Sequence, residues 1–297
     1  MAVRLQPQGR VLVVTLDNPR IKNAFDKATI DAVREVFENL AYRDPLPPDL
    51  APTTPVDGEI GPGGAYRPHA VVLRATGEVF CAGAHLGEMK ALGEADYQEN
   101  LAAALDMGAM FRSVRNCPAP VICRVQGPAF GGGVGLVASC DIVVAGPAAR
   151  FAFTEVKLGL VPGVIAPLVI DRIGQAAARR YFLTAAPFSA AEAKRIGLVD
   201  RLADTDDGER GLDALLVQTV ECVLQGGPAA LGLCKSLLEG VQSLGYNRSA
   251  ELTARMIAQA RTESEGQTAL KAFAASQPAP WNTGNGWSLP PEPDGDA

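Results

Sequence analysis

Apolar residues along the chain follow two alternating patterns, which together predict an α/β protein. A run of β-branched and aliphatic residues over 11–16 ends at Asp17-Asn18-Pro19 and predicts a buried strand that stops in a turn. The next segment, 26–40, carries apolar residues spaced by three or four behind Asp26, which can act as an N-cap. Further apolar runs predict strands at 70–73, 121–125 and 141–145. Strands that alternate with helices favour a mainly parallel sheet with helices on its faces.

Helical spacing recurs after residue 94 and dominates the chain beyond Phe151. A long amphipathic helix is predicted over 94–114, and small residues over 132–139 suit a tightly packed helix. Ser189 with Glu192 three positions later forms a capping-box pattern that opens another helix. Four more amphipathic stretches lie at 211–225, 229–242, 248–261 and 264–275.

The composition changes abruptly in two segments. Residues 42–68 are rich in proline and glycine, which excludes an interior helix or a central strand and indicates a surface insertion. Residues 278–297 hold five prolines and are predicted to form a flexible tail. We therefore expect a core over 1–200 that carries the insertion, and a helical C-terminal region over 201–277.

Composition and charge narrow the class of protein. With 297 residues, of which 47% are apolar, the chain can bury a large core. A net charge of −6 gives no overall attraction to nucleic acid. No apolar run approaches the ~18 residues of a membrane span, and the N-terminus lacks a signal-peptide core, so we expect a cytoplasmic protein without a membrane partner. The six cysteines form no C-x-x-C pair and predict reduced thiols and no metal site.

The segment Gly127-Pro128-Ala129-Phe130-Gly131-Gly132-Gly133-Val134-Gly135-Leu136 is the most informative motif. Three consecutive glycines between a strand and a helix let a ligand or another backbone approach the main chain, and leave helix N-terminal N–H groups free. The spacing matches neither a P-loop nor the dinucleotide fingerprint. Two interpretations stay open: N–H donors that stabilise a developing oxyanion, and a close helix-to-sheet contact that needs only glycine.

A second segment, Phe80-Cys81-Ala82-Gly83-Ala84-His85, can supply another N–H donor. With it, the chain resembles the crotonase superfamily, also called the enoyl-CoA hydratase/isomerase family. The other matching segments are Asn18-Pro19 through Asn23-Ala24-Phe25, Gly127 to Gly133, Cys140-Asp141, and Phe151-Ala152-Phe153-Thr154-Glu155 followed by Leu158-Gly159-Leu160-Val161-Pro162. They come in family order across roughly residues 10–275. The resemblance implies a crotonase (ClpP-like) spiral of ββα units with a helical C-terminal trimerisation region, assembled as a homotrimer or a dimer of trimers.

The resemblance also implies the substrate and the roles of several residues. Family members bind an acyl-CoA thioester, in which coenzyme A belongs to the substrate, so no separate cofactor is expected. The backbone N–H groups that stabilise the enolate oxygen fall on Ala84 and Gly132. The remaining implied substrate contacts are Lys22, Ala24 and Ala82 near the adenine and pantetheine, with His85, Gly131, Pro162 and, from the last helix of a neighbouring subunit, Phe273.

Proton transfer at carbon needs an acid/base side chain. Glu155 matches the second of the two glutamates of the best-known hydratases, and we expect burial to raise its pKa. The first of those glutamates is replaced by Gly135, which puts the two-carboxylate mechanism in doubt. His85 stands where most relatives have aspartate; it is either a second acid/base or a side chain directed away from the thioester.

Three family activities fit a lone glutamate. The glycine turn and the Glu155-to-Pro162 segment resemble branched-chain hydratases of the methylglutaconyl-CoA or isohexenylglutaconyl-CoA type. A Δ3,Δ2-enoyl-CoA isomerase needs one base, and a third group decarboxylates malonyl-type thioesters. We expect reversible hydration of an α,β-unsaturated acyl-CoA, of the branched type where the subgroup resemblance holds. A noncatalytic acyl-CoA-binding subunit stays open because Gly135 removes one acid/base group.

Overall fold

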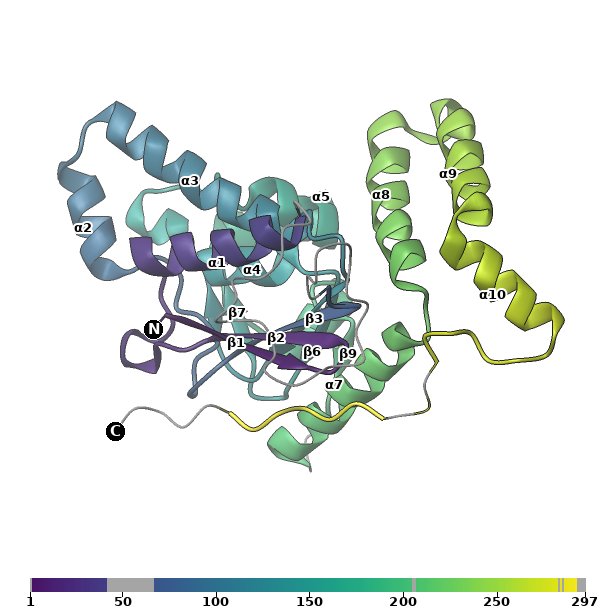
Figure 1. The fold of residues 1–297 in the computed structure, drawn as a ribbon. Coiled ribbons are helices and arrows are strands. Elements are labelled where there is room, and N and C mark those ends of the chain that lie inside the picture. Colours follow the sequence, from purple (N-terminus) through teal and green to yellow (C-terminus); the bar gives the residue numbers. More distant parts are fainter. Residues whose placement is uncertain (1, 42–66, 205–206, 283, 285, 293–297) are drawn as a thin grey trace.

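Six strands form the main sheet of the protein (Figure 1). The structure, a computed structural model, describes residues 2–41, 67–204, 207–282, 284 and 286–292. Within these residues the strand order is β1-β2-β3-β4-β6-β9; β1 and β2 are antiparallel, and the other neighbours are parallel. The bounds are β1 Val3–Gln8, β2 Val11–Leu16, β3 Ala70–Ala75, β4 Val121–Val125, β6 Ile142–Ala145 and β9 Arg201–Leu202.

A smaller sheet and a set of helices complete the described fold. Strand β7 pairs parallel with β5 and antiparallel with β8. The small-sheet strands are β5 Ala129–Phe130, β7 Arg150–Ala152 and β8 Phe188–Ser189. The described helices as far as residue 195 are η1 Pro19–Ile21, α1 Lys27–Ala41, α2 Leu86–Glu94, α3 Tyr97–Arg115, α4 Gly132–Ser139, η2 Glu155–Leu158, α5 Ala166–Thr184 and α6 Ala190–Arg195. The later helices are α7 Gly208–Leu224, α8 Pro228–Leu244, η3 Tyr246–Arg248, α9 Ala250–Thr262 and α10 Ser264–Ala274.

The two faces of the main sheet bury different sets of helices, because side chains alternate along each strand. In β2, Leu12, Val14 and Leu16 pack with α1, α3, α4 and α5. Val11 and Val13 point the other way and pack with α7. Figure 1 shows α1 and α3 on one side of the sheet and α7 on the other. Both faces of β2 are therefore apolar, as expected of a central strand covered on both sides.

The long helix predicted over 94–114 begins later, at Tyr97, and a separate helix precedes it. Asp96 accepts a hydrogen bond from the Glu99 N–H at 2.9 Å, and the Glu99 carboxylate accepts one from the Asp96 N–H at 3.0 Å. This capping box satisfies two N–H groups that a helix start leaves without partners, so α3 starts there. The predicted insertion at 42–68 lies outside the described residues except for 67 and 68.

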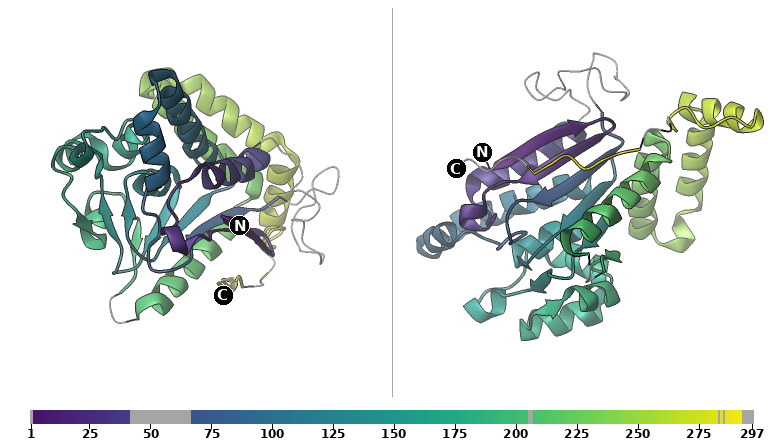
Figure 2. Two further views of the ribbon diagram at one scale, coloured as in Figure 1. Left: turned by 90° about the vertical axis from the view of Figure 1, so that its left-hand side faces the viewer. Right: turned by 90° about the horizontal axis from the view of Figure 1, so that it is seen from below.

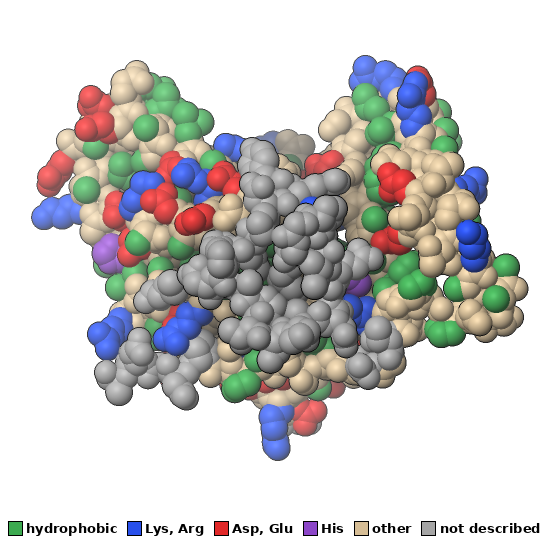
Figure 3. All heavy atoms as spheres, in the orientation of Figure 1, with side chains coloured by type: hydrophobic (Ala, Val, Ile, Leu, Met, Phe, Trp, Pro, Cys, Tyr) green, Lys and Arg blue, Asp and Glu red, His purple; other side chains and the backbone are tan. Residues whose placement is uncertain are grey.

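Charges of both signs are intermixed on the face that carries α1 and α3. Asp106 of α3 pairs with Lys27 and Arg34 of α1. Figure 3 shows acidic and basic side chains intermixed over this part of the surface. The pairs are partly exposed, so their contribution to stability is small and weakens with salt.

A stretch near the C-terminus, residues 286–292, lies against the sheet face that carries α7, and we call it the strap. Arg74 of β3 donates hydrogen bonds to the carbonyl oxygens of Pro290 and Pro291, both at 2.8 Å. Trp287 is buried in the same cluster as the apolar face of α7. The sequence predicted a flexible tail over 278–297. The strap instead makes these contacts with the sheet, which composition alone could not show because Arg74 is distant in the chain.

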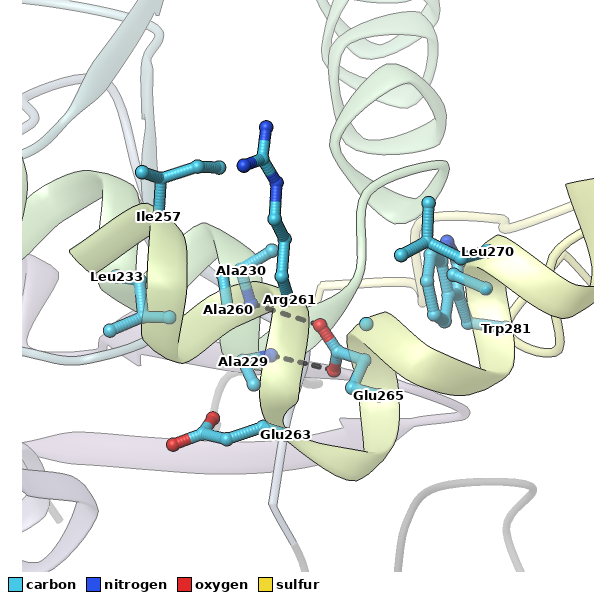
Figure 4. Close-up of a pocket in the computed structure, with 12 residues that line it drawn as sticks. Ala229, Ala230, Leu233, Ile257, Ala260, Arg261, Glu263, Glu265, Leu270 and Trp281 are labelled. Carbon is cyan, nitrogen blue, oxygen red and sulfur yellow. Dashed lines mark hydrogen bonds between the residues drawn. The ribbon is translucent and has the colours of Figure 1, made fainter. Parts of the chain in front are cut away.

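Helices α8, α9 and α10 extend away from the sheet (Figure 2). The Glu265 carboxylate of α10 accepts the N–H groups of Ala229 and Ala230 at 2.9 and 3.0 Å, so α10 caps the start of α8 (Figure 4). A cavity of about 300 Å³ lies between these helices beside Trp281. None of the residues that line it belongs to the motifs that carry the predicted chemistry.

Helix α4 packs closely on the residue that precedes α5. A Cβ atom added to Gly135 would lie 2.2 Å from Ile165 Cγ2 and 3.3 Å from Phe111 Cζ. Ile165 is 3% exposed, so it has no open space into which to withdraw. The volume that a side chain at position 135 would occupy is therefore already filled by Ile165.

This contact gives a stability prediction with a matched control. Gly135→Ala should lower the thermal midpoint of unfolding, because the added methyl overlaps Ile165, at a cost of roughly 1–3 kcal/mol. In Gly93→Ala, also within a helix but with nothing near the added methyl, the midpoint should stay or rise slightly.

The double variant Gly135→Ala/Ile165→Ala separates overlap from other effects. If overlap is the cause, Ile165→Ala should cost less in the alanine background than in the wild type, as a double-mutant cycle of thermal midpoints measures. Additive midpoints would contradict the described packing.

Candidate functional site

Two stretches of main chain, residues 81–84 and 130–133, meet beside the start of α4. The Cys81 N–H donates to the Pro128 carbonyl at 3.2 Å, and the Phe130 N–H donates to the Cys81 carbonyl at 3.0 Å. On the other side of the first stretch, Phe25 donates to Gly83 at 2.7 Å and accepts from the His85 N–H at 2.9 Å. Backbone hydrogen bonds thus fix the 81–84 stretch from both sides.

Glycine is required where the two stretches touch. A Cβ atom on Gly83 would lie 2.7 Å from the Phe130 carbonyl oxygen and 3.5 Å from the Gly132 amide nitrogen. One on Gly133 would lie 2.6 Å from the Cys81 carbonyl oxygen. Gly83 also has φ +89°, which L side chains rarely adopt. The two glycines therefore bring the residues around them, Ala84 and Gly132, close together.

The backbone N–H groups of Ala84 and Gly132 have no hydrogen-bond acceptor within the described part of the chain. Gly132 is the first residue of α4, whose initial N–H groups lack partners inside the helix and carry the positive end of the helix dipole. Both residues are partly accessible. The structure thus presents two unengaged donors from neighbouring segments, an arrangement that can bind a negatively charged oxygen.

Glu155 reaches this place from the first turn of η2, directly after β7. The Gly131 N–H donates to the Ala152 carbonyl at 2.9 Å, which joins the strand before Glu155 to the start of α4. A Cβ atom on Gly131 would lie 3.2 Å from Glu155 Oε1. Gly131, with φ +49°, therefore leaves room for the carboxylate next to Gly132.

The protein environment raises the pKa of Glu155, so its carboxyl group stays protonated to a higher pH than it would in water. Burial raises the pKa of Glu155, and a hydrogen bond from its own backbone N–H opposes this only in part. Oxygen Oε2 is buried and has no hydrogen-bond partner among the described residues. A carboxyl group whose pKa is shifted by burial beside free N–H donors is a candidate acid/base group.

Aromatic rings form an apolar wall beside the two N–H groups. The rings of Phe25 and Phe111 meet edge to face with centroids 6.0 Å apart, and a Cβ atom on Gly132 would lie 3.2 Å from the Phe25 ring. Burial raises the pKa of the nearby Cys81 thiol to about 12, so this cysteine stays neutral at physiological pH. The wall therefore lowers the local polarity without adding a second charged group.

His85 lies close enough to Asp26, the residue before α1, for its charge to act on the Asp26 carboxyl group. Burial disfavours ionisation of Asp26, but hydrogen bonds from Thr29 and the charge of His85 outweigh it and lower the Asp26 pKa. The His85 ring also lies beside Gly87, where an added Cβ would come within 3.1 Å of Nδ1. Both interpretations of His85, a second acid/base and a side chain directed away from the thioester, stay predictions.

Lys22, Ala24 and Ala82 lie in one loop region next to the N–H groups. The Ala82 N–H donates to the Lys22 carbonyl at 3.0 Å, and the Lys22 side chain is exposed. Sequence analysis gave no role to Asn23, whose buried amide donates to the carbonyls of Thr76 and Val79, both at 2.9 Å. Asn23 has φ +52°, so its side chain holds this strained loop in place.

Pro162 and Phe273 differ in how they relate to Glu155. Pro162 is buried in the loop after η2. In this loop the Leu160 N–H donates a hydrogen bond to the Glu155 carbonyl at 3.0 Å, which connects the loop to the glutamate. Phe273 lies on α10 and is 82% exposed; within one chain α10 packs on α9, far from α4 (Figure 1). A single chain therefore places Ala84, Gly131, Gly132 and Glu155 next to one another, whereas Phe273 lies elsewhere.

The described residues contain neither a metal-site cluster nor a single helix that could span a membrane. No group of three or more His, Cys, Asp or Glu side chains in them has the arrangement of a metal site. No single described helix is long and apolar enough to cross a membrane. Among the described helices, α7 and α8 together reach the length and apolar composition of a membrane span, but the pair is bent by 97° at its junction.

Known proteins resemble this chain along most of its length. The family model described as enoyl-CoA hydratase/isomerase matches residues 66–284. A Thermus thermophilus protein, named provisionally as an enoyl-CoA hydratase, is 33% identical over 239 residues, which cover 80% of this chain and 91% of the relative. The enoyl-CoA isomerase/hydratase fer4 of Mycosarcoma maydis is 31% identical over 192 residues, 64% of each chain.

Solved structures extend the similarity to the fold. An enoyl-CoA hydratase from Shewanella pealeana has a TM-score of 0.81 at 30% identity, covering 95% of this chain and 96% of that one. Pseudomonas aeruginosa AtuE has a TM-score of 0.81 at 29% identity, covering 95% and 99%. The finer resemblance to methylglutaconyl-CoA hydratases stays a prediction. The predicted crotonase fold is confirmed, and the chain belongs to the enoyl-CoA hydratase/isomerase family.

Proposed function

We propose that this protein catalyses the reversible addition of water to an α,β-unsaturated acyl-CoA thioester. The observation that carries the proposal is the grouping of two unengaged N–H donors, on Ala84 and Gly132, with one partly buried carboxyl group, Glu155. The names of the relatives from T. thermophilus and S. pealeana support hydration as the reaction.

The two N–H donors would act on the thioester oxygen. When the oxygen of water adds to C3, the electron pair of the C2=C3 bond moves toward the carbonyl group and negative charge collects on its oxygen. Preorganised N–H groups stabilise such a charge by about 3 kcal/mol each. The Ala84 and Gly132 donors come from separate segments and are held by the backbone contacts of Gly83 and Gly133, so they need little rearrangement as the charge develops.

Glu155 alone can carry both proton transfers. The ionised carboxylate takes a proton from water while the water oxygen bonds to C3, which leaves an enolate. The protonated carboxyl group then gives a proton to C2, so one hydroxyl and one hydrogen are added and Glu155 returns to its starting state. A pKa raised by burial suits a group that must accept and release a proton in one cycle.

A one-glutamate mechanism also agrees with the surroundings of Gly135. Ile165 fills the space where a side chain at position 135 would begin, and Phe111 lies behind it. A second carboxylate from this position is therefore excluded by packing as well as by sequence. A branched acyl group stays a prediction from the resemblance to the branched-chain hydratases.

Isomerisation of a 3-enoyl-CoA is the second candidate. One carboxylate in an apolar site is sufficient to take a proton from C2 and return it to C4, with no water added. The name of the M. maydis relative covers both isomerase and hydratase activity. We rank hydration first because the relatives named above as hydratases cover more of this chain.

The remaining substrate contacts follow from the loop around the two donors. We assign Lys22, Ala24 and Ala82 to the coenzyme A moiety, and Gly131 and Pro162 to the acyl end next to Glu155. We assign His85 no contact with the substrate, because its ring lies beside Gly87 and its charge acts on Asp26. A cytoplasmic location stays a prediction from sequence.

Assembly into a homotrimer or a dimer of trimers is part of the proposal. Phe273 and Leu270 of α10, and Tyr246 before α9, are large apolar side chains that a single chain leaves exposed. Such residues commonly mark surfaces that contact another chain. In an assembly, Phe273 would reach the coenzyme A site of a neighbouring copy.

Product analysis tests the reaction itself. The protein is incubated in ¹⁸O-labelled water with 2-enoyl, 3-enoyl, methylglutaconyl and malonyl thioesters of coenzyme A, and product masses are measured. Hydration predicts a 3-hydroxyacyl-CoA that carries ¹⁸O, with the highest kcat/KM for a branched 2-enoyl substrate. Conversion of the 3-enoyl thioester without ¹⁸O would instead establish the isomerase, and loss of carbon dioxide the decarboxylase. Stoichiometric binding without turnover of any thioester would leave a noncatalytic acyl-CoA-binding subunit.

Replacing Glu155 by glutamine tests the acid/base assignment. Glu155→Gln should lower kcat by about 10²–10⁴-fold, because an amide can neither take nor give the proton, while binding of a saturated acyl-CoA stays unchanged. Glu251→Gln, an exposed glutamate of α9 paired with Arg255, is the matched control and should keep full activity. Wild-type turnover in Glu155→Gln would remove Glu155 from the mechanism.

The pH dependence follows from the pKa of Glu155. Hydration needs the ionised carboxylate, so activity is lost as the pH falls through this pKa. Burial raises the pKa, and the acidic limb of kcat/KM should therefore lie above the ordinary glutamate value of about 4.3. A pH profile measured within the stable range of the protein checks this, and a limb at or below about 4.3 would contradict the described environment.

A further inference from the structure

A second cavity lies on the opposite face of the sheet from Glu155. It has a volume of about 420 Å³ and is enclosed by the ends of β3 and β4, by α7 and by the strap. Its walls contribute two arginines, Arg74 and Arg124, and the indole of Trp287. Volumes of about 300–1,000 Å³ are typical of small-molecule sites. No residue assigned to acyl-CoA above belongs to this cavity.

The strand register places the two arginines side by side. Val72 of β3 pairs with Ile122 of β4, and Arg74 and Arg124 follow two residues later on the same face. Because β3 and β4 are parallel, both arginines lie at the carboxyl ends of their strands, the edge at which α/β sheets bind ligands. Arg74 and Arg124 are only 1% and 2% exposed. Two guanidinium groups are thus held together in a position shielded from water.

Arg74 already has four hydrogen-bond partners, and all of them are neutral. It donates to Thr15 Oγ1 at 3.1 Å, to Gln6 Oε1 at 2.9 Å, and to the carbonyls of Pro290 and Pro291. These partners orient the guanidinium and attach the strap, but they do not neutralise its charge. Arg74 therefore contributes a fixed positive charge to the wall of the cavity.

Arg124 and Trp287 leave donors unused. Arg124 Nε donates to Asp213 Oδ1 at 2.6 Å, but Arg124 Nη1 is buried without a partner among the described residues. Trp287 Nε1 is likewise buried without a partner in the described part of the chain. Buried donors are normally satisfied, so two of them around one cavity, one from the sheet and one from the strap, indicate an acceptor that completes the site.

We propose that this cavity binds a small oxyanion, a carboxylate or phosphate group, through Arg124 Nη1 and the Trp287 indole N–H. Arginine is suited to both groups because its planar donors match their oxygens. Three carboxylates, Glu209, Asp213 and Glu292, also line the cavity. Asp213 is paired with Arg124, whereas Glu209 and Glu292 are exposed, where salt screens their charge. The site is independent of the proposed hydration.

Binding of inorganic phosphate and of acetate to the full-length protein tests the proposal. Calorimetric titration at constant ionic strength, with chloride as the reference salt, should give a saturable heat for at least one of the two anions, and the one that binds identifies the group. That anion should also raise the thermal midpoint in a saturable way. No saturable binding of either anion would overturn the proposal.

Three variants separate this site from general salt effects. Trp287→Phe keeps an aromatic ring at this position but removes the indole N–H together with part of the ring, and Arg124→Gln removes the free guanidinium donor; each should weaken binding about tenfold or more. Arg255→Gln, an exposed arginine of α9, should change nothing. Equal stabilisation of all four proteins by the anion would show a general salt effect and overturn the site.

A fourth variant tests the sign of the electrostatic argument and does not depend on weakening the fold. Glu292→Gln removes a negative charge from the lining and should tighten anion binding. Weaker binding in Glu292→Gln, in a protein with an unchanged thermal midpoint, would also overturn the proposal.

Discussion

The close approach of two stretches of main chain, 81–84 and 130–133, is the constraint on which the rest of the structure depends. Side chains cannot occupy the interface, since added Cβ atoms on Gly83 and Gly133 would fall 2.7 and 2.6 Å from carbonyl oxygens. Backbone hydrogen bonds take their place. The first N–H of α4 and the N–H of Ala84 are left free beside each other, and Gly131 leaves space for Glu155. Donors and carboxylate are thus positioned by backbone rather than by flexible side chains.

The sheet separates the molecule into two environments. On one face, α1, α3, α4 and α5 bury a large apolar cluster and support the loops that carry Glu155. On the other, α7 and the strap cover a smaller cluster that gives way to polar residues at the carboxyl ends of the strands. Alternation of side chains along each strand is sufficient to produce this division. The same parallel strands therefore support two sites without either sharing side chains with the other.

Much of this arrangement is readable from local sequence, because it depends on residues close together in the chain. The strand at 11–16 and the helix after Asp26 follow from periodicity, and the glycine motif correctly places a helix start at Gly132. The acid/base role of Glu155 could be predicted only through the family resemblance, because nothing in its own segment distinguishes it from a surface glutamate. The pairing of Ala84 with Gly132 likewise rested on the family resemblance, and the backbone contacts around Gly83 explain how the two residues come close together.

What sequence analysis missed depends on pairs of residues that are distant in the chain. Ile165 fills the space of a side chain at Gly135, thirty positions earlier, and Arg74 binds the carbonyl groups of Pro290 and Pro291. Neither contact leaves a periodic signal. Phe273 is different in kind: the family resemblance places it in a neighbouring copy, and one chain cannot bring it to Glu155.

The contact between Gly135 and Ile165 restricts how this active site can change over evolution. A glutamate at position 135 would supply a second carboxylate, but its Cβ would start 2.2 Å from Ile165. Shortening Ile165 first would open a hole in the core and gain nothing by itself. Each single step is thus unfavourable. Truncation of Ile165 to alanine would remove its Cγ2 but keep its Cβ, 2.9 Å from a Cβ atom at position 135, so the main chain would also have to shift. A carboxylate at position 135 is therefore reached only through several coordinated changes, which makes the one-carboxylate arrangement hard to leave by single substitutions.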